Sequence, residues 1–228
     1  MTTRKQFMGV IRKALGRTET PLNAPRFMYR HTVHEDVMKD WSQDALAHSF
    51  MEYSRIIGGH VCETTREELN PAIRKALEKC ASGPVILADD ILLEELNTGT
   101  ALATDRAVRI WNAGGTREEN IRFAEKAAVG IAVAKMALAE SATVLVFSHN
   151  GCGRSVTLLP ESVIYIIPKS RIRPRLTQGM EYLHRNRKRL PSSANFVSGP
   201  SATSDIELVR VVGVHGPVHV THIVVHDL

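Results

Sequence analysis

Two glycine-containing loops have the residue types that could bind an anion. The first loop, 148–154, reads SHNGCGR and follows a β-branched run, and the second loop, 199–205, reads GPSATSD and follows Phe196-Val197. A sharp glycine turn after a strand leaves backbone N–H groups without partners, and such groups can bind a carboxylate or a phosphate. We expect the two loops to lie at neighbouring strand ends and to form one cradle for a small anion. The alternative is two short connections that bind nothing.

Two side chains could carry acid–base or nucleophilic chemistry. Glu140 is expected near the end of a short helix, where it is either a general base or a structural group that bonds a neighbouring turn, and we favour the structural role. Cys152 stands close to His149, which suggests a nucleophile with its base, although a structural thiol is the simpler interpretation. Neither loop matches the P-loop or the dinucleotide fingerprint, so neither motif predicts ATP or a dinucleotide.

Carboxylates and histidines supply the remaining candidates. Asp89-Asp90 follow an expected strand, at the end where α/β sheets usually bind ligands, but they also suit the first turn of the next helix. Four histidines fall within twelve residues, namely His215, His219, His222 and His226. Alternation along a strand sends His219 to one face and the two that follow to the other, so the four cannot converge and we expect no metal. His215, in a glycine-flanked turn, is the better functional candidate.

Two blocks of sequence carry a family resemblance. The C-terminal block contains Gly199-Pro200-Ser201, Thr203, Asp205-Ile206-Glu207 and Gly213-Val214-His215-Gly216-Pro217. The central block, 127–160, contains Gly130-Ile131, Ala139-Glu140 and Leu158-Leu159-Pro160. In both blocks the chain resembles the lactate-utilisation protein C family (LutC/YkgG type), which is built on a LUD domain. The blocks cover most of the latter half of the chain, whereas residues 1–100 match only in helical pattern.

The resemblance implies a fold and a pocket. The fold is similar to that of the NagB/RpiA/CoA-transferase group, a three-layer α/β/α sandwich whose members bind anionic molecules at the strand tips. The implied catalytic residues are Glu140, Asp205 and His215. The implied ligand-binding residues are Ser148, Gly151, Gly153, Arg154, Gly199, Ser201 and Thr203. The chain departs from the usual family pattern at Ala142, Val163 and Ala202, where a glycine, a histidine and a basic residue are common.

The resemblance also implies a role. Members of the family work with two partners, one or more of which carry iron–sulfur clusters, in oxidising L-lactate to pyruvate. An accessory or substrate-binding component that takes a small anionic metabolite is therefore expected. Three widely spaced cysteines without a C-x-x-C pair predict neither an iron–sulfur cluster nor another cofactor in this chain. The alternatives are a stand-alone isomerase, CoA or acyl transferase, or ligase, with Glu140 or Asp205 as base, and an interaction module that acts through its N-terminal and basic helices.

The composition is that of one globular domain. A chain of 228 residues with 43% hydrophobic and 23% charged residues can bury a single core. No apolar run approaches the roughly 18–20 residues that cross a bilayer, and the N-terminus lacks the features of a signal peptide, so we expect a cytoplasmic protein without membrane insertion. The net charge of +5 is local, because residues 169–189 hold eight basic residues against Glu181. This segment contains one aromatic residue, Tyr182, and suits an acidic protein better than a nucleic acid.

Helices and strands are expected to alternate and so to position these loops. Helices are predicted over 4–15, around 46–57, from Pro71 with Asn70 as cap, over 91–96, from Thr116 with a capping box to Glu119, over 136–140, and from Pro174 with Leu176, Met180, Leu183 and Leu190 facing the core. Strands are predicted over 60–63, 84–88, 107–111, 128–133, 143–147, 163–167, 196–198 and 218–225. Ser204 and Glu207 have capping-box spacing, which predicts a helix after the second loop. The alternation favours a mainly parallel α/β sandwich over 46–228, with an N-terminal helical extension over 1–45.

Overall fold

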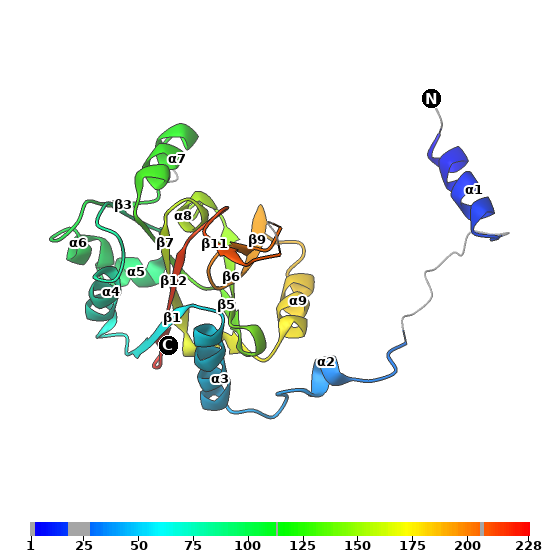
Figure 1. Cartoon of the computed structure of the whole chain (residues 1–228), viewed down its shortest axis with the longest axis horizontal. Coiled ribbons are helices and arrows are strands. Elements are labelled where there is room, and N and C mark those ends of the chain that lie inside the picture. The colour runs from blue at the N-terminus through cyan, green and yellow to red at the C-terminus, as the bar shows by residue number, and fades with distance from the viewer. Residues whose placement is uncertain (1–2, 18–27, 113, 206–207) are drawn as a thin grey trace. The chain divides into compact units, whose positions relative to one another are not determined.

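A computed structural model describes residues 3–17, 28–112, 114–205 and 208–228 (Figure 1). The chain divides into two compact units, Met1–Val33 and His34–Leu228, and each is described by itself. In the first unit, α1 (Arg4–Ala14) begins with a capping box between Thr3 and Gln6. None of its residues is buried, so the predicted apolar stripe of this helix is exposed. A short helix, α2 (Val33–Asp36), spans the boundary.

Six parallel strands form the central sheet of the second unit. Their order across the sheet is β1-β12-β7-β4-β2-β3, and every neighbouring pair runs parallel. Their bounds are β1 (His60–Thr64), β2 (Val85–Leu87), β3 (Val108–Ile110), β4 (Val129–Val133), β7 (Ser162–Pro168) and β12 (His219–Val225). All six lie where the sequence predicts strands. The central strand β7 is buried along its whole length, as expected of a parallel strand covered on both faces.

Helices cover both faces of this sheet. One face carries α3 (Gln43–Ile56), α7 (Arg117–Lys126) and α8 (Ser155–Leu158), and the other carries α4 (Leu69–Leu77), α5 (Ile91–Glu95) and α6 (Thr98–Leu102). Phe50 of α3 and Ala124 of α7 are fully buried on the first face, as are Leu69 and Ile73 of α4 on the second. The predicted α/β fold, with a mostly parallel sheet between helices, is therefore confirmed.

A second sheet of four strands lies on the same side of the central sheet as α3. Its order is β8-β5-β6-β9, with β5 (Met136–Leu138), β6 (Thr143–Ser148), β8 (Ile172–Arg173) and β9 (Ser193–Ser198), and the short 3-10 turns η1 (Ala139–Ser141) and η2 (Lys169–Arg171) adjoin it. Ala137 and Val144 point from this sheet into the core beneath α3. Met136, Leu138 and Leu145 point the other way and pack against α9 (Leu176–Arg185).

The helix predicted over 136–140 is wrong, because residues 136–138 form β5 and the next three form η1. All three residues of β5 are buried, on alternate sides of the second sheet. A short apolar run that is buried on both sides has no periodicity that separates a strand from a helix. Pairing with β6 and β8 therefore decides the conformation.

The start of α4 also differs from the prediction. The helix begins at Leu69 with Glu68 as N-cap, so the assignment of Asn70 as cap is wrong. Pro71 is the third residue of the helix, where its missing N–H costs no hydrogen bond because the first four N–H groups of a helix have no acceptor within it. A proline near a helix start therefore does not fix the first residue.

The inner face of α9 is rotated from the predicted one. Leu176 and Met180 are about half exposed, and Leu190 lies beyond the end of the helix. Leu183 faces the second sheet as predicted, together with Tyr182, which was not predicted to do so. Of the four predicted core positions, Leu183 alone joins the core, because the second sheet sets which side of the helix is covered.

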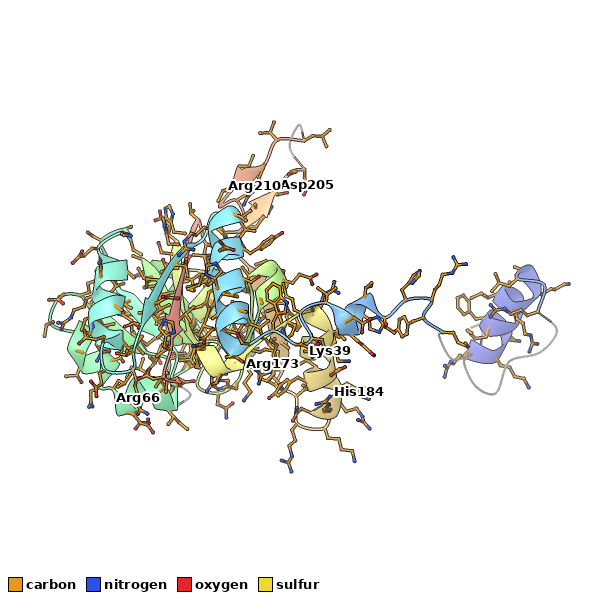
Figure 2. All side chains as sticks on the ribbon, turned by 90° about the horizontal axis from the view of Figure 1, so that it is seen from below. Lys39, Arg66, Arg173, His184, Asp205 and Arg210 are labelled. Atoms are coloured by element: carbon orange, nitrogen blue, oxygen red, sulfur yellow. The ribbon has the colours of Figure 1, made fainter. Side chains whose placement is uncertain are left out.

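A hairpin of β10 (Ala202–Thr203) and β11 (Val211–Val212) stands out from the second unit, with Asp205 and Arg210 near its end (Figure 2). The helix predicted to open at Ser204 is not formed by the described residues of this segment. Its other capping residue, Glu207, lies outside the described residues. Pairing with β11 instead holds Ala202 and Thr203 in a strand just before Ser204. No helix in the described part of the chain has the length and apolar character needed to span a membrane.

Candidate anion-binding site

The carboxyl ends of β2 and β4 border a crevice where the chain changes direction across the sheet. From β2 the chain continues to β3 on one side, and from β4 the next strand of this sheet is β7 on the other side. Ligands of open α/β sheets usually bind at such a switch point, because the connecting segments diverge and leave a gap beyond the strand ends. A cavity of about 220 Å³, here named the switch-point crevice, lies at these ends and is lined by Ala88, Asp90, Ala132, Val133, Lys135, Val146, Phe147, His149, Cys152 and Arg171.

The first predicted loop, 148–154, forms one wall of the switch-point crevice. The backbone N–H of Asp89, two residues after β2, donates a 2.7 Å hydrogen bond to the carbonyl oxygen of Gly151. A Cβ at Gly151 would lie 2.6 Å from the carbonyl oxygen of Asp89, and one at Gly153 would lie 2.2 Å from Cζ2 of Trp111. Both glycines are therefore needed for the loop to pack this closely against the ends of β2 and β3.

The polar groups of the crevice favour a negatively charged ligand. Lys135 is exposed beyond the end of β4, and Arg171 is half-buried, with its Nη1 donating a 2.9 Å hydrogen bond to the carbonyl oxygen of Ala134. Nδ1 of His149 accepts a 3.1 Å hydrogen bond from the N–H of Gly151, which leaves Nε2 of the neutral ring as a donor. Two cations and a neutral donor can bind a carboxylate or a phosphate.

The carboxylate of Asp90 lies at the edge of the crevice and is already engaged. Its Oδ1 accepts a 3.0 Å hydrogen bond from the N–H of Leu92, because Asp90 is the N-cap of α5. The alternative role considered for Asp89-Asp90, as charges in the first turn of a helix, therefore describes Asp90 well. Its charge is also favourable at that helix end, which reduces its opposition to an incoming anion.

Cys152 is buried in the wall of the crevice. Burial raises the pKa of its thiol to about 12, and the nearby Asp90 carboxylate adds to the effect. The thiolate is the nucleophilic form of cysteine, so this thiol stays protonated and unreactive at neutral pH. The interpretation of Cys152 as a structural thiol is supported, and a catalytic cysteine is not.

The second predicted loop, 199–205, lies at the opposite end of the sheet. Because β9 runs antiparallel to β6, Ser198 pairs with Thr143 at the start of β6, whereas the first loop follows the end of that strand. A six-residue strand spans about 17 Å. The N–H of Ser201 bonds to the carbonyl oxygen of Pro217, just before the amino end of β12. The expectation that the two loops meet in one cradle is therefore wrong.

The predicted site residues thus fall into separate places. Ser148, Gly151, Gly153 and Arg154 lie beside the switch-point crevice, whereas Gly199, Ser201, Thr203, Asp205 and His215 lie in or next to the hairpin of β10 and β11. Within the second group, Oγ1 of Thr203 donates a 2.8 Å hydrogen bond to Asp205, and the side chains of Asp205 and His215 are exposed.

Glu140 stands apart from both groups. It lies in η1, between β5 and β6, at the end of β6 that is opposite to the first loop. Its Oε2 accepts a 2.7 Å hydrogen bond from Nε of Arg175. The arrangement agrees with the structural role favoured for this carboxylate, and its catalytic role stays a prediction.

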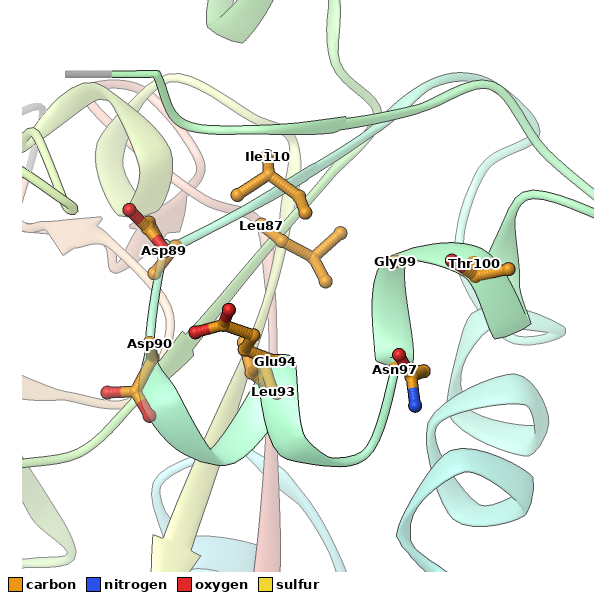
Figure 3. A pocket seen from close by; sticks show the side chains of 10 residues that line it. Leu87, Asp89, Asp90, Leu93, Glu94, Asn97, Gly99, Thr100 and Ile110 are labelled. Atoms are coloured by element: carbon orange, nitrogen blue, oxygen red, sulfur yellow. The ribbon is translucent and has the colours of Figure 1, made fainter. Parts of the chain in front are cut away.

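A second cavity, of about 190 Å³, adjoins the crevice across Asp90 (Figure 3). Asp89, Asp90 and Glu94 give it an acidic character, and Figure 3 shows the two aspartates on the side opposite to Gly99 and Thr100. Within the described residues, no three His, Cys, Asp or Glu side chains come together as metal ligands would. The acidic cavity therefore does not suit an anion and carries no metal-binding set.

Sequence reasoning missed Lys135 and Arg171. Lys135 lies two residues after the strand predicted over 128–133, and a basic residue near the carboxyl end of a strand is a usable signal for an anion site. Arg171 was counted among the charges of the basic segment 169–189. No local pattern relates the two residues, because strand order in the sheet brings them together.

Comparison with known proteins decides the family. Residues 47–225 match the LUD domain. Proteins named lactate utilization protein C from Geobacillus sp. (strain WCH70) and Bacillus subtilis (strain 168) are 38% and 35% identical to the chain, and each match covers 98% of this chain and 96% of the relative. The chain belongs to the lactate utilization protein C family of LUD-domain proteins. The resemblance inferred from the two sequence blocks is therefore confirmed.

The LUD fold is also found in a solved structure. A DUF162 family protein from Deinococcus radiodurans superposes with a TM-score of 0.60 at 22% sequence identity, and the match covers 81% of this chain and 99% of that one. At this identity the likeness concerns the fold alone. The switch-point crevice of the LUD domain described above rests on the geometry of this chain.

Proposed function

We propose that this chain is a lactate-utilisation component that binds L-lactate, or a small carboxylate of the same kind, in the switch-point crevice. The names of its relatives support the pathway. The guanidinium of Arg171, held by the carbonyl of Ala134, suits a carboxylate, and Nε2 of His149 can donate to a further oxygen. The observation that carries the proposal is the convergence of Lys135 and Arg171 on one switch-point crevice.

An accessory role beside iron–sulfur subunits follows from the same proposal. Oxidation of lactate to pyruvate releases two electrons, which need a redox group to accept them. Iron–sulfur clusters usually take four cysteine ligands, and this chain has three cysteines in total, of which Cys152 is buried. We therefore infer that the clusters belong to partner subunits and that this chain presents or retains the organic anion.

Calorimetric titration of the full chain with L-lactate tests the site. Lys135→Gln and Arg171→Gln should each weaken binding by about ten- to hundredfold, because a hydrogen bond to a charged group contributes about 1.5–3 kcal/mol. Lys126→Gln is the matched control: it removes an exposed lysine at the end of α7 that does not line the crevice, and should change affinity by less than about twofold. Equal losses in all three variants, or no saturable binding, would contradict the proposal.

Isolation of the intact complex from the native host tests the partners. Iron-containing subunits should co-purify with the chain and be identified by mass spectrometry. Oxidation of L-lactate by the purified chain alone, with a dye as electron acceptor, would show that the accessory role is wrong. The alternative of a stand-alone isomerase, CoA or acyl transferase, or ligase has less support, because neither Glu140 nor Asp205 lines the crevice.

A further inference from the structure

A larger cavity, of about 400 Å³, lies between the second sheet and α9, apart from the carboxyl ends of β2 and β4. We name it the α9 cavity. The charged and aromatic residues that line it are Lys135, Arg171, Arg173, Glu181, Tyr182 and Arg185. Figure 2 shows Arg173, which belongs to β8, beside α9. Most of the residues that line the cavity therefore belong to the basic segment 169–189.

The charge of the α9 cavity is strongly positive. Four cationic side chains line it, against one carboxylate, that of Glu181. Glu181 is itself paired with Arg185, with Nη2 and Oε2 3.0 Å apart. The pair is exposed and leaves the guanidinium of Arg185 with further N–H groups. An anion inside the cavity therefore meets uncompensated positive charge.

Two of the guanidinium groups are held in place by the backbone. Nη1 of Arg173 donates hydrogen bonds of 2.8 Å and 2.9 Å to the carbonyl oxygens of Ser170 and Ile172, and Nη1 of Arg171 donates to Ala134. A guanidinium has five N–H groups, so both side chains keep donors for a ligand. Groups that are already oriented lose little side-chain entropy on binding. This favours an anion that binds in one defined position over anions that are only loosely attracted to the surface.

The α9 cavity also offers aromatic surface. Nζ of Lys135 lies 5.9 Å from the ring centre of Tyr182, and the rings of Tyr182 and Phe147 are 6.3 Å apart. Phe147 lines the switch-point crevice, and Lys135 and Arg171 line both cavities. The two cavities are thus neighbours that share cations, and each lies near or within the size range of small-molecule sites, about 300–1,000 Å³.

We propose that the α9 cavity binds the phosphate group of a small phosphorylated molecule. Oriented guanidinium forks from η2 and β8 match the tetrahedral oxygens of a phosphate, and the concave wall suits a small molecule better than the convex surface of an acidic protein. The site goes beyond the lactate site proposed above. Because Lys135 and Arg171 face both cavities, a bound phosphate group neutralises cations that lactate needs, and occupancy of the α9 cavity lowers lactate affinity.

Titration of the full chain with inorganic phosphate and with inorganic pyrophosphate tests this site. Both probes should bind saturably, with pyrophosphate the tighter. Arg173→Gln and Arg185→Gln should each weaken pyrophosphate binding by about tenfold. Arg187→Gln is the control, because Arg187 lies in the same basic segment but does not line the cavity, and it should change affinity by less than about twofold. Saturating pyrophosphate should weaken L-lactate binding.

Several results would overturn the phosphate site. Equal losses in Arg173→Gln, Arg185→Gln and Arg187→Gln would mean general attraction to a basic surface. Tight binding of an oligoglutamate peptide that is lost in Arg173→Gln, together with no saturable binding of pyrophosphate, would mean an acidic protein partner. Arg185 is exposed, so its variant keeps the fold even if Arg173→Gln disturbs β8, and an unchanged Arg185→Gln affinity also counts against the site. Loss of lactate binding alone would refute only the lactate proposal.

Discussion

The backbone N–H of Asp89 donates a hydrogen bond to the carbonyl oxygen of Gly151, and this contact joins the end of β2 to the loop that walls the switch-point crevice. The two residues approach so closely that a Cβ at Gly151 would lie 2.6 Å from the carbonyl oxygen of Asp89. The loop is therefore packed in one position, and this position places the side chains of His149 and Cys152 in the wall of the crevice.

Gly151→Ala should move this loop and weaken the anion site. Overpacking of a close backbone contact costs about 1–3 kcal/mol, so the free energy of unfolding should fall by that amount in urea denaturation. Affinity for L-lactate should fall as well, because His149, whose Nε2 can donate to the ligand, belongs to the displaced loop. In Gly115→Ala the added Cβ meets its nearest neighbours at 3.4 Å, an ordinary contact, so this control should change stability by less than about 0.5 kcal/mol. A Gly151→Ala protein as stable as the control would contradict the packing argument.

Glu140→Gln should leave ligand binding intact. Glu140 pairs with Arg175, and the side chains of the two are 40% and 22% exposed, so the loss of stability should be at most about 1 kcal/mol. L-lactate affinity should stay within about twofold, because the residue lies away from the crevice. A large loss of activity in a folded Glu140→Gln protein would instead revive its role as a general base.

His222 should make the protein less stable in mild acid. Its imidazole is fully buried, with Nδ1 2.6 Å from Oγ of Ser54, and Nε2 has no hydrogen-bond partner among the described residues. Burial lowers the pKa of His222 to about 3 from the usual 6.5. Below pH 6.5 the unfolded chain takes up a proton that the folded chain refuses, so stability is lost as pH falls from 6.5 towards 3.

The free energy of unfolding should therefore drop by about 1.4 kcal/mol between pH 7.5 and 5.5 through this one group. Urea denaturation at several pH values measures the drop, and His222→Gln should lack this component while keeping a polar group near Ser54. The difference between the two proteins separates His222 from the exposed histidines. Identical pH dependence in both proteins would show that His222 is not neutral in the folded state.

Ala142 should tolerate glycine and reject a β-branched residue. Ala142 is fully buried with a φ of +45° and a ψ of +38°, a left-handed conformation that costs a side-chain-bearing residue about 1–2 kcal/mol. In Ala142→Gly, relief of this strain offsets the lost burial of a methyl group, about 0.8 kcal/mol, and the greater freedom of glycine in the unfolded chain, about 0.4–1 kcal/mol. The net change should be under about 1 kcal/mol. Ala142→Val should destabilise by more than about 2 kcal/mol in the same urea assay.

Cys152 should be dispensable for binding and slow to react. With a pKa near 12, its thiol should alkylate with iodoacetamide far more slowly at pH 8 than a free thiol does, as peptide mass mapping of the folded protein would show. Cys152→Ala should keep L-lactate affinity within about twofold, although the lost sulfur leaves a small cavity that costs about 1 kcal/mol. Rapid labelling of Cys152 in the native protein would contradict its burial.

Local signals in the sequence determined much of the fold. The capping box from Thr116 to Glu119 predicted the start of α7, and strands were predicted at all six positions of the central sheet, most clearly over 84–88, an apolar run between turn residues. These signals work because a helix cap depends on residues within one turn, and a buried parallel strand must be apolar on both faces. The family, too, was readable from two ordered blocks of sequence.

Strand order and strand direction, by contrast, were decided only by the tertiary structure. The antiparallel pairing of Ser198 with Thr143 sends the second loop to the amino ends of the central strands, so two glycine-containing loops that each follow a strand face opposite ends of the sheet. The parallel pairing of β5 with β8 places Lys135 and Arg171, each just before one of these strands, in one crevice. Residues distant in the chain share a site only through hydrogen bonds between strands, and no short stretch of sequence encodes which strands will pair.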